Sequence, residues 1–217
     1  MNNPRENLRP MPALIALCTV VALEIALRPV LPADATLRMA ATGALRVVEA
    51  IGMLWWVSRL PSGLTAIGLD RESFSGGLRT GLIWSAVFAI VVAAAAAIIY
   101  YGFNTDPRSL IHAEVPKGLA RIGLFLFVAG LVSPIAEEIF FRGILYSALR
   151  NWGAAIAIIG STALFTIVHS GPSFPIIQCI GGLVFACAIG KSRSLVSPMV
   201  IHILGNLAIY GISMISG

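Results

Sequence analysis

The chain has 217 residues, of which 58% are hydrophobic and 12% charged, with a formal net charge of +5. A soluble domain has about 45–50% apolar and about 25% charged residues. Half the usual charge leaves too few polar side chains to cover a water-facing surface, so the composition predicts a membrane protein. Lys and Arg stand singly between apolar runs, which is typical of charges flanking membrane spans and argues against nucleic-acid binding.

The three cysteines lie inside apolar runs and show no CxxC spacing: Cys18, Cys179 and Cys187. We interpret them as small packing residues, not as a disulfide framework or a zinc site.

A membrane-crossing helix needs about 20 apolar residues. The chain therefore predicts an all-α, polytopic transmembrane helix bundle of about seven spans, with six to eight as the range. The expected spans are 11–32, 36–58, 82–103, 118–148, 152–169, 174–190 and 195–214.

Two of these spans are irregular. Pro134 lies inside the fourth, which is long for one straight crossing, so we expect a kink or break there or an eighth segment. The sixth is short and bracketed by Gly171, Pro172 and Pro175, so a re-entrant segment is an alternative.

The first run follows Arg5 and Arg9, and Ala33-Asp34-Ala35 resembles a signal-peptidase site. Because the apolar stretch is long and contains Glu24 and Arg28, we favour a retained first span over a cleaved signal.

Basic residues fall in alternate connections, which is the pattern of the positive-inside rule. With seven spans this predicts a cytoplasmic N-terminus and an outside C-terminus in the cell membrane. The basic segments are the N-terminus (Arg5, Arg9), the loop 59–81 (Arg59, Arg71, Arg79), Arg150, and the loop with Lys191 and Arg193.

Charged residues within apolar spans are costly, at about 2.5–3.5 kcal/mol each, and so need a partner or a function. Glu24 with Arg28, and Arg46 with Glu49, have i,i+4 and i,i+3 spacing and are expected to form structural ion pairs on one helix face.

Glu137 and Glu138 are adjacent in an apolar helix and point about 100° apart, so they cannot share one role. Glu138 is four residues from Arg142 and can pair with it. Glu137 has no local partner and must face a protein interior or a water pocket. A general base and a second structural ion pair are both open readings of Glu137 from this segment alone.

Three histidines are present. His112 lies in a polar connector and is expected to be an ordinary surface residue, whereas His169 and His202 lie in the fifth and seventh spans. His202 shares a helix face with Asn206. A rise of about 1.5 Å per residue puts Glu137 and these two histidines roughly 16–27 Å from the expected cytoplasmic ends, so we expect them to converge.

These residues form three motifs: Glu137-Glu138-x-x-x-Arg142, Phe165-x-x-x-His169 and His202-x-x-x-Asn206. Their order and spacing resemble the CPBP (Abi) family, which comprises type II CAAX prenyl endopeptidases and bacterial relatives. The resemblance covers roughly residues 130–206. The most polar segments, 59–81 and 104–117, are too short to be domains, so we expect a single integral membrane domain, 1–217, with its catalytic core in 118–214.

The resemblance implies an intramembrane endopeptidase of the glutamate type. Glu137 would activate a water with help from His169, and His202 and Asn206 would bind the developing oxyanion. The supporting residues would be Glu138, Arg142 and Phe165. These roles satisfy the needs of amide hydrolysis: a base for the water, donors for the oxyanion and a proton for the leaving amine.

A cofactor is not favoured. Zinc is the alternative, bound by Glu137, His169 and His202 with one open position. Against zinc, Asn206 is a poor ligand and the HExxH spacing is absent.

Other functions remain open from the residues alone. A proton-coupled membrane transporter would use Glu137 and the histidines as a relay, and a catalytically inactive scaffold or immunity protein would keep the fold only. No GxSxG or Gly-x-Gly-Asp occurs, which argues against serine and aspartyl intramembrane proteases. The partners we expect are the lipid bilayer and a peptide or protein substrate that is lipid-attached or has a hydrophobic C-terminal tail.

Overall fold

The computed structural model describes residues 8–110, 113–171 and 174–216. Within them the secondary structure is helical, without strands. The main helices are α1 (Pro10–Leu27), α2 (Ala35–Ser58), α3 (Arg71–Phe103), α4 (Leu119–Phe127), α5 (Ser133–Glu138), α6 (Ser147–Leu149), α7 (Ala154–Val168), α8 (Ile176–Ser192) and α9 (Val196–Ser216). The expected all-α helix bundle is confirmed.

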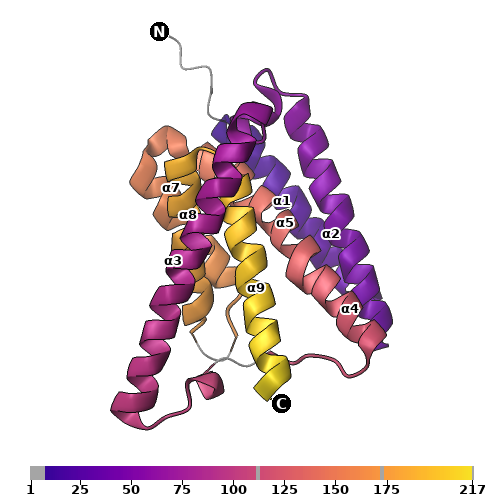
Figure 1. The fold of residues 1–217 in the computed structure, drawn as a ribbon. Helices are drawn as coiled ribbons and strands as arrows, with labels where there is room; N and C mark the ends of the chain where they lie inside the picture. Colours follow the sequence, from indigo (N-terminus) through magenta and orange to yellow (C-terminus); the bar gives the residue numbers. More distant parts are fainter. Residues whose placement is uncertain (1–7, 111–112, 172–173, 217) are drawn as a thin grey trace.

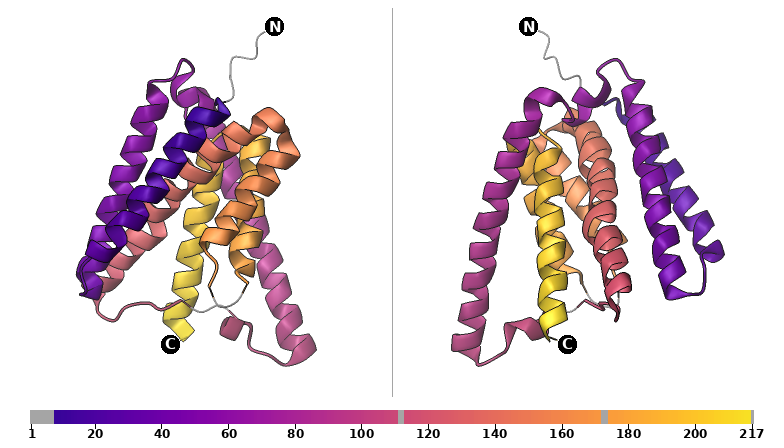
Figure 2. Two further views of the ribbon diagram at one scale, coloured as in Figure 1. Left: turned by 180° about the vertical axis from the view of Figure 1, so that it is seen from behind. Right: turned by 45° about the vertical axis from the view of Figure 1, so that its right-hand side comes forward.

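Successive passes run in opposite directions (Figures 1 and 2). The first begins with α1 at the end drawn uppermost in Figure 1, and α9 ends at the opposite end. Five described helical stretches are long and apolar enough to cross a membrane, whereas α7 and α8 are shorter, at 15 and 17 residues. The chain is a multi-pass membrane protein.

The fourth pass is one uninterrupted helix of 34 residues, Leu119–Trp152. It contains α4, α5 and α6, with two π-helical stretches at Val128–Val132 and Ile139–Tyr146. The alternatives of a break at Pro134 and of an eighth segment are wrong, and a kink there stays a prediction. The π-helical turn just before Pro134 lets the helix continue past a residue that cannot donate a backbone hydrogen bond.

The third pass begins 11 residues earlier than the expected 82–103, because α3 starts at Arg71. Asp70 caps it by accepting a hydrogen bond from the Ser73 amide. The first turns of α3 are polar, so the hydropathy of the sequence placed them in the loop 59–81. They form a helix because Gly77 and Gly81 allow α3 to approach the start of α9 and the residues before it closely.

The fourth helix is the centre of the bundle. All eight residues of Ile139–Tyr146 are buried. The pair α1–α2 packs on one of its sides, and α7 and α9 pack against others. Figure 2 shows the α1–α2 pair standing beside the remaining helices. The central helix therefore carries the Glu137 motif where several other helices can reach it.

The basic connections gather at one end of the bundle. The start of α1, the α2–α3 connection, the end of the fourth helix and the α8–α9 connection all lie at the upper end in Figure 1. This is the clustering expected from the alternating charge pattern, while the assignment of that end to the cytoplasm stays a prediction. Arg5 and His112 lie outside the described residues.

Candidate active site

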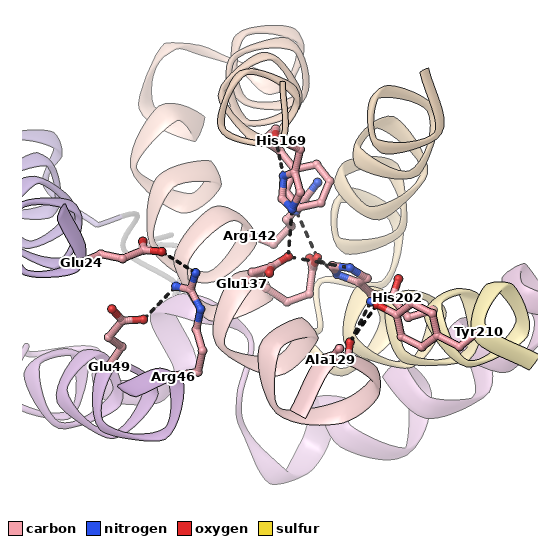
Figure 3. Close-up of polar contacts among 12 residues, drawn as sticks. Glu24, Arg46, Glu49, Ala129, Glu137, Arg142, His169, His202 and Tyr210 are labelled. Atoms are coloured by element: carbon pink, nitrogen blue, oxygen red, sulfur yellow. Dashed lines mark hydrogen bonds and ion pairs between the residues drawn. The ribbon is translucent and has the colours of Figure 1, made fainter. Parts of the chain in front are cut away.

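The carboxylate of Glu137 lies between two imidazoles from other helices. Its Oε2 is 3.8 Å from Nε2 of His169, at the end of α7, and 3.8 Å from Nε2 of His202, in α9. The Glu137 side chain is 16% exposed. Figure 3 shows both rings directed toward this carboxylate. The convergence expected from helical depth is present in the structure.

Each histidine is oriented through its other ring nitrogen. Nδ1 of His169 lies 2.8 Å from the carbonyl oxygen of Phe165, and Nδ1 of His202 lies 2.8 Å from Oε1 of Glu138. Because both partners are acceptors, the Nδ1 atoms carry the protons. In the neutral form of each ring Nε2 is then an acceptor without a proton, and it becomes a donor only in the imidazolium form.

Glu138 hydrogen-bonds to both Arg142 and His202. Its Oε1 accepts from Nη1 of Arg142 at 3.1 Å as well as from His202, and the side chains of Glu138 and Arg142 are fully buried. Nη2 of Arg142 donates to the carbonyl of Gly182 in α8 at 3.1 Å. The expected Glu138–Arg142 pair is present, and its link to His202 is an addition.

Aromatic rings surround this ion pair. The guanidinium of Arg142 lies over the rings of Phe165 at 4.5 Å, Phe185 at 5.1 Å and Phe141 at 5.6 Å. Phe165 also contacts the ring of His169, at 4.4 Å between centroids, and Phe185 stacks on His202 at 4.6 Å. These contacts are favourable for a cation held away from water. Phe165 thus packs between the arginine and the site.

Asn206 lies one turn beyond His202 on α9 and donates through Nδ2 to the carbonyl of Ala129 at 3.1 Å. Tyr210 approaches the same carbonyl at 3.5 Å. Pro134 explains why this oxygen needs donors, because a proline five residues further along a π-helical turn has no N–H to offer it. Within the described residues, no hydrogen bond joins Asn206 to Glu137 or to either histidine.

A second charged group lies near the site. Arg46 of α2 donates through Nη2 to Glu24 of α1 at 2.7 Å and through Nη1 to Glu49 at 2.9 Å (Figure 3). The Arg46–Glu49 pair was expected, whereas the contact between α1 and α2 was not. The side chain of Arg28 lies outside the described part, so its pairing with Glu24 stays a prediction.

Sequence reasoning missed Tyr210, Phe185 and the carbonyls of Ala129 and Gly182. Tyr210 had a signal, since it continues the four-residue spacing from Asn206. A backbone carbonyl leaves no mark in a sequence, and Phe185 lies in a generally apolar helix.

Zinc is the metal that the resemblance raises. Two ligands of one tetrahedral zinc lie about 3.4 Å apart, whereas Glu137 Oε2 is 3.8 Å from each histidine Nε2. Among the described side chains, no group of three His, Cys, Asp or Glu residues is arranged to hold a metal ion. Zinc therefore stays an alternative, and a metal-free site stays a prediction.

Comparison with known families gives one match, the family described as type II CAAX prenyl endopeptidase Rce1-like, over residues 120–208. The resemblance drawn from the three motifs is confirmed. All three motifs lie inside the matched segment, which contains nearly all of the fourth helix, α7, α8 and most of α9. No solved structure matches the chain significantly.

Two curated proteins are similar to this chain. "Putative membrane peptidase YdiL" of Bacillus subtilis (strain 168) is 27% identical over 113 residues, covering 52% of this chain and 46% of the relative. "Membrane-embedded CAAX protease MroQ" of Staphylococcus aureus (strain USA300) is 24% identical over 127 residues, covering 55% and 50%. The chain spans about half the length of these relatives.

Proposed function

We propose that the chain is a membrane-embedded endopeptidase that hydrolyses peptide bonds with Glu137 as the base. The observation that carries the proposal is the position of the Glu137 carboxylate, 3.8 Å from an imidazole nitrogen on each of two other helices. A carboxylate and two imidazoles supply the acid–base groups that amide hydrolysis needs. The Rce1-like match and the peptidase names of the two relatives support this reaction class.

Glu137 and His169 activate the water. A water about 2.8 Å from Glu137 Oε2 can also reach Nε2 of His169, since these two atoms are 3.8 Å apart. Glu137 takes one proton, and the water oxygen forms a bond to the carbonyl carbon of the substrate. The C–N bond then breaks and the protonated Glu137 returns the proton to the leaving amine, so one water is consumed for each bond cleaved.

His202 stabilises the oxyanion through Nε2. Its Nδ1 proton is committed to Glu138, so donation from Nε2 requires the imidazolium form, in which both ring nitrogens carry protons. Glu138 therefore acts as a positioning residue that holds the orientation of the His202 ring, as the carboxylate of a catalytic triad does for its histidine.

Asn206 is the second oxyanion donor in this proposal. Its amide has two N–H groups, and the bond to Ala129 uses one. The other remains to donate to a substrate oxygen between α9 and the fourth helix.

The substrate class that suits the site is a peptide held in the bilayer by an attached lipid or a hydrophobic C-terminal tail. Residues 118–214 form the catalytic core of a single membrane domain in this proposal. The reaction is of the glutamate type and requires no metal.

Cleavage of a fluorogenic peptide library by the purified full-length protein tests this function. Products are identified by mass spectrometry in water enriched in oxygen-18. We expect peptides that carry the label in the new carboxylate. Glu137→Ala should yield none while the protein still inserts and migrates as the wild type does. Equal cleavage by the variant would end the proposal.

A further inference from the structure

A small hollow of about 120 Å³ opens at the basic end of the bundle. It lies between the connection that follows α2, the end of the fourth helix and the end of α8. Two arginines line it from different elements, Arg150 after α6 and Arg193 at the end of α8. It is separate from the Glu137 site, since none of the residues of the three motifs lines it.

Among the residues that the structure describes, the lining offers hydrogen-bond donors and no carboxylate. Thr65, Tyr146 and Ser147 contribute hydroxyl groups. Tyr146 is 4% exposed and Ser147 8% exposed. No side-chain hydrogen bond joins any of these three hydroxyls to another described residue, and no Asp or Glu is among the lining residues that the structure describes. Three donors and two guanidinium groups around one hollow favour an anion with several acceptor oxygens.

Exposed tryptophans place the hollow at the membrane surface. Trp152, two residues after Arg150, is 54% exposed, and Trp55 near the end of α2 is 60% exposed. Both lie at the same end of the bundle as the hollow. Tryptophan is enriched where the hydrocarbon meets the headgroups, so the hollow lies at the depth of lipid phosphates.

We propose that this hollow binds the phosphate group of an anionic phospholipid. Guanidinium groups bind phosphate with two parallel hydrogen bonds. Basic pockets between membrane helices are known to bind anionic headgroups at the cytoplasmic side. The competing explanation is that Arg150 and Arg193 are ordinary cations at the ends of their helices. They would then bind phosphate no better than other surface cations.

The test uses full-length protein in detergent micelles and counts bound lipid by native mass spectrometry. Short-chain phosphatidylglycerol is compared with phosphatidylcholine, and inorganic phosphate is added in a separate arm. The hollow variant is Arg150→Gln/Arg193→Gln. The matched control is Arg71→Gln/Lys191→Gln, which removes two exposed charges from the same end outside the hollow. Thr65→Val keeps every charge and removes one hydroxyl.

We expect the wild type to bind phosphatidylglycerol in preference to phosphatidylcholine. The hollow variant should lose about tenfold or more of that preference, because each basic residue strengthens binding to an anionic lipid. The control should retain the preference to within about threefold. Thr65→Val should lie between the two, because the hydroxyl donates directly.

The two sources of phosphate are distinguished by the competition arm. Displacement of the lipid by inorganic phosphate, in the wild type but not in the hollow variant, would show that the hollow takes the free ion as well. Failure to displace assigns it to the headgroup. Equal losses in both double variants, or no preference in the wild type, would overturn the proposal.

Discussion

Glu138 and His202 are joined by a hydrogen bond of 2.8 Å between Oε1 and Nδ1, across 64 residues of sequence and two helices of the bundle. Both side chains are buried, and the same oxygen also accepts from Arg142. The motif that contains Glu137 therefore supplies two carboxylates with different tasks. In the proposed mechanism Glu137 acts on the water, and Glu138 orients His202 beside it.

Glu138→Gln tests this division of tasks. The amide keeps the size of the side chain but loses the negative charge that accepts from Nδ1 of His202, and it can turn its NH₂ toward Nδ1. We expect kcat for peptide cleavage to fall by about 10²–10⁴, the range seen when the carboxylate of a triad becomes an amide. KM should change little. Rates are measured per folded molecule, with Glu72→Gln, an exposed carboxylate in the first turn of α3, as the control. An unchanged kcat would remove Glu138 from this role.

Arg142→Met tests the buried ion pair. Removing one partner leaves the Glu138 charge buried without compensation and costs about 3–5 kcal/mol of unfolding free energy. It also removes the contacts of the guanidinium with three aromatic rings. Melting in detergent is the measurement. The control is Arg108→Met, which removes an exposed pair with Asp106 and should leave the melting temperature unchanged. Similar melting of both variants would contradict the account.

Asn206→Ala tests whether Asn206 binds the oxyanion or only donates a structural hydrogen bond to the Ala129 carbonyl. If its free N–H binds the oxyanion, kcat falls by about 10²–10³ with the melting temperature nearly unchanged. Tyr210→Phe is the matched control, because it removes the other group that approaches the Ala129 carbonyl. We expect it to retain nearly full kcat. A loss of stability without a loss of kcat in Asn206→Ala would limit Asn206 to satisfying that carbonyl.

The orientation is tested by labelling single cysteines in cells. Cys18, Cys179 and Cys187 are free and can be replaced by alanine. Pro61→Cys then marks the basic end and Thr105→Cys the opposite end. An impermeant maleimide should label position 105 from outside and position 61 only after the membrane is opened. The reverse pattern would place the basic end outside.

The spans could be predicted because each is an apolar run, whereas the orientation inferred from the alternating charges stays a prediction. The start of α3 could not, since its first turns are polar and become helical through close packing of Gly77 and Gly81. The continuity of the fourth helix through Pro134 could not be distinguished from a break there by sequence alone. It depends on a π-helical turn and on donors from α9 that only the folded bundle brings near.

The site residues could be named from their spacing, but their connections could not. The four-residue spacing of Glu138 and Arg142 indicated their pair, which the structure contains. The link from Glu138 to His202 and the link from Glu24 to Arg46 join different helices, so no local pattern indicates them. Tertiary packing decides such contacts.

The central claim is tested most directly by the turnover of Glu137→Gln beside Glu72→Gln, each measured with and without a chelator on one cleaved peptide. The account predicts that Glu137→Gln loses cleavage while remaining folded and inserted, and that Glu72→Gln and the wild type keep it in the presence of the chelator. Near-wild-type turnover by Glu137→Gln would contradict Glu137 as the base. Loss of wild-type activity to the chelator with recovery on adding zinc would contradict the metal-free mechanism and make Glu137, His169 and His202 ligands.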